Sequence, residues 1–155
     1  MSFRISALPV EPFAPLFSMN DAQLRERRAV RRTVDASPGY PCRVSLMDAA
    51  IGESVILVNF EHQPADTPYR ASHAIFVREG AAQARPKVGE IPEVLRRRLL
   101  SVRAFDAADM LLEADVVDGR ELEPAIERMF RDTRARYLHL HNAKPGCYAA
   151  RVDRG

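Results

Sequence analysis

Strand-length apolar runs separated by turn residues constrain the fold of this chain more than any other feature. The runs are "SVILVNF" (54–60), "HAIFVRE" (73–79), "SVRAF" (101–105) and "MLLEADVV" (110–117). A further run, "YLHLHN" (137–142), alternates with the period of two that is typical of a strand. Pro, Gly and Asp gather between the runs, as they do in the turns of antiparallel sheets. We therefore expect residues 42–60, 72–78, 101–117 and 136–153 to form one mostly antiparallel sheet.

Helical patterns are fewer than strand patterns. Asn20, followed by Gln23 three residues later, has the pattern of a capping box and predicts a helix to about Arg31. Leu122, Ile126, Met129 and Phe130 have helical spacing and predict an amphipathic helix over about 121–133. Shorter helices are expected after Pro12 and within "EVLRRRLL".

These patterns together predict an α+β fold in a single domain over 1–155, with a mostly antiparallel sheet and two or three packed helices. Residues 1–35 would form an N-terminal strand and helices, and residues 40–153 a sheet-rich core. The length of 155 residues suits one domain.

Charge and hydropathy exclude several classes of partner. The net charge of +2 is too small to indicate nucleic-acid binding, which requires a concentrated basic face. No stretch approaches the roughly 18 apolar residues of a membrane span, so no membrane partner is expected. The opening "MSFRISALPVEPF" lacks the apolar run of an export signal, which predicts a cytoplasmic protein. Cys42 and Cys147 should then be thiols without a disulfide.

The stretch "YLHLHN" has two chemically different faces if it is a strand. Leu138 and Leu140 should face the core, and His139 and His141 should then face solvent, a cleft or a partner. Two imidazoles at this spacing can bind one divalent metal ion if a third ligand is nearby. Ordinary surface or half-buried histidines are the more common interpretation of such a weak pattern.

The register of the hairpin that follows decides which face carries Cys147. A loop with an even number of residues, such as 143–146, pairs Asn142 with Cys147 and places the thiol on the leucine face. An odd loop, such as 144–146, places it with the histidines, because a slip of one residue reverses a strand's faces. The sequence leaves both possibilities open.

Both cysteines follow a Pro-Gly turn. Pro followed by Gly favours a type II turn, in which Gly takes positive φ, and each cysteine would then begin a strand. A reactive cysteine needs a neighbouring base or cation, but Arg43 should point to the opposite face of a strand from Cys42. Buried, inert thiols are therefore the default interpretation. The basic run "RRR" at 96–98, with Arg103 nearby, could bind an anion, although a solvated helix face is the simpler explanation.

Four stretches resemble a bacterial family catalogued as a domain of unknown function, number twelve-oh-three of that series. They are "PGYPCRVSLMDAAIGESVILVNFEH", "PYRASHAIFVREG", "LRRRLLSVRAFDAADMLLEADVVDG" and "YLHLHNAKPGCYAARV". The resemblance implies a small soluble bacterial protein and brings no activity with it. It covers the same segments that the residue patterns single out.

These observations favour a small-molecule binding domain with one polar cleft, and they leave open whether it is an enzyme. An anionic or carbonyl-bearing ligand would suit its arginine and amide groups, and a histidine base would be the simplest catalyst. No cofactor is expected apart from a possible divalent metal. The alternatives are a metal-binding protein that uses His139 and His141, and an interaction module without a small ligand. The expected ligand-binding residues are Cys42, Arg43, Tyr69, His73, His141, Asn142 and Cys147.

Overall fold

The computed structural model describes residues 2–155. The chain folds into two compact units, which are described separately. The first comprises residues 2–6, 61–71 and 85–155, and the second comprises residues 7–60 and 72–84. Strands in antiparallel sheets together with short helices confirm the predicted α+β class.

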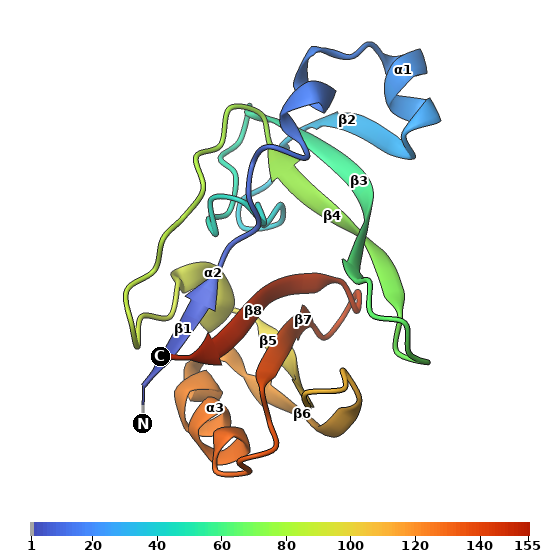
Figure 1. The fold of residues 1–155 in the computed structure, drawn as a ribbon. Coiled ribbons are helices and arrows are strands. Elements are labelled where there is room, and N and C mark those ends of the chain that lie inside the picture. The colour runs from blue at the N-terminus through green and yellow to red at the C-terminus, as the bar shows by residue number, and fades with distance from the viewer. Residues whose placement is uncertain (1) are drawn as a thin grey trace. The chain divides into compact units, whose positions relative to one another are not determined.

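The first unit contains the larger sheet, in which the order of the described strands is β1-β8-β7-β5-β6 (Figure 1). Every neighbouring pair in it is antiparallel. The strands are β1 (Phe3–Ser6), β5 (Leu99–Phe105), β6 (Leu111–Asp118), β7 (Tyr137–Asn142) and β8 (Tyr148–Arg154). The helices of this unit are α2 (Glu93–Arg96), η2 (Gly119–Glu121) and α3 (Leu122–Phe130).

One face of the larger sheet forms the core of the first unit. Leu138 and Leu140 of β7 are fully buried, as are Leu100 and Val102 of β5. Helix α3 packs against β5 and β6 and buries the apolar stripe predicted from its spacing, Leu122, Ile126, Met129 and Phe130. The predicted leucine face of "YLHLHN" is therefore confirmed.

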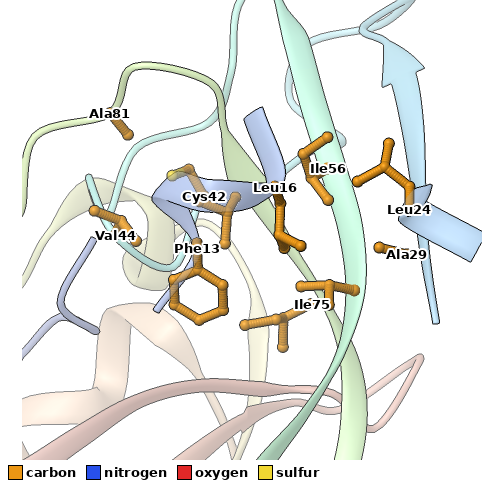
Figure 2. Close-up of a cluster of buried hydrophobic side chains, with 11 residues drawn as sticks. Phe13, Leu16, Leu24, Ala29, Cys42, Val44, Ile56, Ile75 and Ala81 are labelled. Atoms are coloured by element: carbon orange, nitrogen blue, oxygen red, sulfur yellow. The ribbon is translucent and has the colours of Figure 1, made fainter. Parts of the chain in front are cut away.

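The second unit contains the smaller sheet, with the strand order β2-β3-β4. These strands are β2 (Ala29–Thr33), β3 (Ser54–Gln63) and β4 (Ala71–Arg78), and the helices are η1 (Ala14–Ser18) and α1 (Asp21–Glu26). The predicted capping box of α1 is present, because Asn20 and Gln23 exchange two hydrogen bonds of 2.9 Å. Figure 2 shows the core, where Phe13, Leu16 and Leu24 gather around Ile56 and Ile75.

The prediction of one sheet is wrong, since the strands at 54–63 and 71–78 join β2 and not the strands at 99–154. The helix predicted to reach Arg31 ends at Glu26. Arg28 then takes a left-handed conformation with φ 54°, and residues 29–33 pair with β3. This pairing buries Ala29, a tertiary gain that outweighs local helix propensity.

The prediction of a strand at 42–46 is also wrong. This segment forms a turn, and Pro41 and Cys42 make only isolated bridges. The Leu46 amide donates to the Cys42 carbonyl at 3.0 Å, and Leu46 has φ 52°.

Within the described residues neither cysteine forms a disulfide, as predicted, and both are buried. Gly146 has the predicted positive φ of 80°.

The buried leucine face gives a direct stability prediction. Leu138→Ala should lower the free energy of unfolding by about 2–5 kcal/mol, because the fully buried side chain leaves a cavity. Val116→Ala, on the exposed part of β6, is the matched control and should change it by less than about 0.5 kcal/mol. Urea denaturation measures both, and equal losses would contradict the assignment of the two faces.

Candidate functional site

The other face of the larger sheet carries aromatic and basic side chains. On β7, Tyr137, His139 and His141 alternate with the buried leucines. The register with β5 pairs Phe105 with Tyr137 and Arg103 with His139. Residues paired in this way lie on the same face of a sheet. An arginine and two aromatic side chains therefore surround His139.

A bulge in β8 adds two further residues to this face. His141 pairs with Tyr148 but Leu140 pairs with Ala150, so β8 contains one extra residue. Tyr148 and Arg151 consequently lie on the same face although their separation in sequence is odd. The Tyr148 ring centroid lies 5.3 Å from that of His139, and the Arg151 guanidinium lies 4.1 Å from the Tyr137 ring centroid.

The hairpin register is the even one of the two that the sequence left open. The Asn142 amide donates to the Cys147 carbonyl at 2.9 Å, which closes the loop 143–146. Asn142 and Cys147 therefore share the leucine face. There the side-chain amide of Asn142 donates to the Cys147 sulfur at 3.7 Å. His141 points to the opposite face, and its Nδ1 lies 2.9 Å from the Gly146 carbonyl oxygen.

The segment 61–71 adds a third imidazole to the histidine face. His62 stacks on Tyr148 with ring centroids 5.3 Å apart and an interplanar angle of 12°. Its centroid lies 4.9 Å from that of His141 and 6.0 Å from that of His139. Three of the four histidines of the sequence thus form one cluster.

A cavity of about 270 Å³ lies beside this cluster. All of its lining residues belong to the first unit. They come from the segment 61–71 and from strands β5, β6 and β7. The lining consists of His62, Gln63, Tyr69, Ala71, Arg103, Phe105, Leu111, Ala114, His139 and His141.

His139 is neutral at physiological pH. Its side chain is buried, and burial is the main cause that lowers its pKa to about 3. Electrostatic interactions with His141, His62, Arg151 and Arg103 lower the pKa of His139 further. Nδ1 of His139 is buried and has no hydrogen-bond partner among residues 2–155. His139 is a lining residue of the cavity, so the cavity wall contains a neutral imidazole with one buried nitrogen that lacks a hydrogen-bond partner.

Arg103 brings a positive charge to the cavity. Its Nε donates to Ser101 Oγ at 3.1 Å, and no carboxylate of the described residues pairs with its guanidinium. Burial lowers its pKa, but a guanidinium remains protonated at neutral pH. Arg151 differs, because Asp153 pairs with it at 2.9 Å.

Tyr137 stays protonated beside this cluster. Its hydroxyl donates to Asp109 Oδ1 at 2.6 Å and accepts from Gln63 Nε2 at 2.9 Å. Burial and the hydrogen bond to Asp109 raise the pKa of Tyr137 to about 12. The tyrosine therefore anchors Gln63 at the cavity wall.

The residues predicted as one site are divided by the structure. Tyr69 and His141 line the cavity, and so does His139 from the metal alternative. Asn142 and Cys147 lie in the same unit but on the opposite face of the sheet. The remaining three predicted residues, Cys42, Arg43 and His73, belong to the second unit.

Each of these three residues has a definite environment in the second unit. Cys42 lies in the core cluster, where its sulfur accepts from the amides of Ser45 and Arg78 at 3.4 and 3.3 Å. Arg43 is buried and donates to the Pro41 carbonyl oxygen. His73 is half-buried, with Nδ1 3.2 Å from the Ala74 carbonyl oxygen.

Sequence reasoning missed the contributions of His62 and Arg103 to this site. Arg103 was identifiable, because alternation along "SVRAF" separates it from Val102 and Ala104, which face the core. His62 lies beyond the strand predicted at 54–60, although β3 extends to Gln63, and nothing in its local pattern indicates that it joins the other histidines.

Two further structural features bear on the class of function. No group of three or more His, Cys, Asp or Glu side chains among residues 2–155 is arranged to hold a metal ion. No helix in the described part of the chain is both long enough and apolar enough to cross a membrane.

Comparison with known proteins gives one match. A family model described as "Protein of unknown function (DUF1203)" matches residues 39–154, which confirms the resemblance noted in the sequence. No curated protein and no solved structure matches the chain.

The lowered pKa of His139 predicts how stability depends on pH. Between pH 6.5 and about 3 the unfolded chain binds a proton at this residue and the folded chain does not. Stability should therefore fall as the pH falls through this window. The variant His139→Gln should lose roughly 3 kcal/mol less stability than the wild type between about pH 7 and about pH 4.

Urea denaturation at a series of pH values measures this difference. The control Gln83→Asn changes a half-buried side chain of the second unit that does not titrate and should keep the wild-type dependence on pH. If His139→Gln keeps that dependence too, His139 is protonated in the folded protein and the assignment of a neutral imidazole is wrong.

Proposed function

We propose that this chain, which belongs to the DUF1203 family, binds a small anionic ligand in the cavity on the histidine face of its larger sheet. The proposal depends on the environment of Arg103. Its guanidinium is partly buried, lines the cavity and lacks a carboxylate partner among the described residues. A desolvated cation without a counter-ion is costly, and a bound carboxylate or phosphate group would remove that cost.

The rest of the lining supports a small organic anion. Gln63 and Tyr69 offer hydrogen-bonding groups, and Phe105 and Leu111 offer an apolar wall for a carbon skeleton. This mixture of a mostly apolar surface with a few polar groups is typical of ligand sites. The volume of about 270 Å³ lies near the lower limit of roughly 300 Å³ for such sites, which favours a ligand of few atoms.

The proposal retains one part of the sequence-based expectation and changes another. The sequence favours an anionic or carbonyl-bearing ligand with Arg43 among its binding residues. The proposal keeps the anion and assigns the cation that binds it to Arg103. The concentration of His139, His141 and Tyr69 around one cavity favours a ligand site over an interaction module without a small ligand.

Substitution of Arg103 tests the proposal. Isothermal titration of the wild type with a panel of small carboxylates, phosphate and sulfate should identify at least one anion that binds. Arg103→Gln should weaken its binding at least about tenfold, because loss of a desolvated charge partner usually costs more than about 1.4 kcal/mol.

Arg136→Gln is the matched control, because it removes the same charge from an exposed position of the same unit. It should bind the anion as the wild type does. The proposal fails if no anion of the panel binds to the wild type. It also fails if Arg103→Gln and Arg136→Gln both bind like the wild type.

A further inference from the structure

We propose that the ligand is a hydroxy acid, an organic anion with a hydroxyl group next to its acidic group, held by Arg103 and His139 together. This inference rests on the proposed function and names the class of its ligand. Its basis is the juxtaposition of Arg103, which has no carboxylate partner, and His139, whose Nδ1 has no hydrogen-bond partner, among the described residues.

Arg103 and His139 are cross-strand neighbours. They pair directly in the register of β5 and β7, so they lie on the same face with Cβ atoms about 4.5–5.5 Å apart. Both line the same cavity. One small ligand in the cavity can therefore contact both side chains.

The two side chains can bind different chemical groups of a ligand. The Arg103 guanidinium has only donors and suits a carboxylate. His139 is buried, and its Nδ1 has no partner among the described residues. A neutral imidazole has one N–H and one lone pair. A hydroxyl both donates and accepts, so it satisfies Nδ1 in either tautomer.

The other charged groups of this face argue against a ligand with two acidic groups. Arg151 is already paired with Asp153 and lies over the Tyr137 ring. The Tyr137 hydroxyl is engaged by Asp109 and Gln63. Arg103 thus provides the position for one acidic group, and His139 provides the position for an uncharged polar group.

Pairs of ligands that differ only in a hydroxyl group test this inference on the wild-type protein. Glycolate is compared with acetate, and lactate with propionate, in titrations followed by NMR, which measures weak binding. We expect the hydroxy acid of each pair to bind at least about tenfold more tightly, because a polar site rejects the analogue that leaves its groups unpaired. The imidazole ¹⁵N signals of His139 should shift with glycolate and much less with acetate.

A variant then assigns the preference to His139. His139→Phe keeps a ring of similar size and removes both nitrogens, so the preference for glycolate should fall to about twofold or less, while acetate still binds. His73→Phe, in the second unit, is the control and should keep the wild-type preference. Should His139→Phe not fold, the wild-type ligand pairs and the His139 signals decide the question by themselves.

The possible failures are distinguishable. If acetate and glycolate bind equally and Arg103→Gln weakens both, the hydroxy-acid inference is overturned and anion binding stands. A preference for glycolate that His139→Phe retains also overturns it. If neither anion of either pair binds to the wild type, the hydroxy-acid inference is overturned. Phosphate and the other anions of the panel then decide whether the proposed function fails with it.

Discussion

Burial of strand β7 on both faces is the constraint on which the first unit depends. All six of its residues are buried, although Tyr137, His139 and His141 alternate with the leucines. Burial of polar groups is unfavourable unless they find partners. Leu138 and Leu140 need only apolar packing. The opposite face must be satisfied by its neighbours or by something that binds to it.

The neighbours satisfy most of that face. Aromatic rings from β5, β7, β8 and the segment 61–71 contact one another with centroids 4.9 to 6.4 Å apart. Asp153 neutralises Arg151, and Asp109 and Gln63 bind the Tyr137 hydroxyl. The Arg103 guanidinium has no carboxylate partner, and Nδ1 of His139 has no hydrogen-bond partner, among the described residues. They line the same cavity, which is why a ligand explains them together.

The sequence predicted the parts of the structure that depend on local periodicity. The alternation in "YLHLHN" separated the two faces of β7, and the Asn20–Gln23 pattern identified the start of α1. Pairing between distant segments was not predictable in the same way. The division into two sheets depends on which strands meet, and the bulge near Ala150 is invisible in a pattern with period two. Both decide which side chains join His139, so the site was predicted only in part.

Anomalous scattering from selenate would test the central claim most directly, because selenate is a small oxyanion whose position can be seen without assumptions about the natural ligand. Crystals of the wild-type protein would be soaked in selenate and an anomalous difference map calculated. The account predicts a peak in the cavity, within hydrogen-bond distance of the Arg103 guanidinium. Peaks only at exposed arginines such as Arg131 and Arg136, with none beside Arg103, would contradict it.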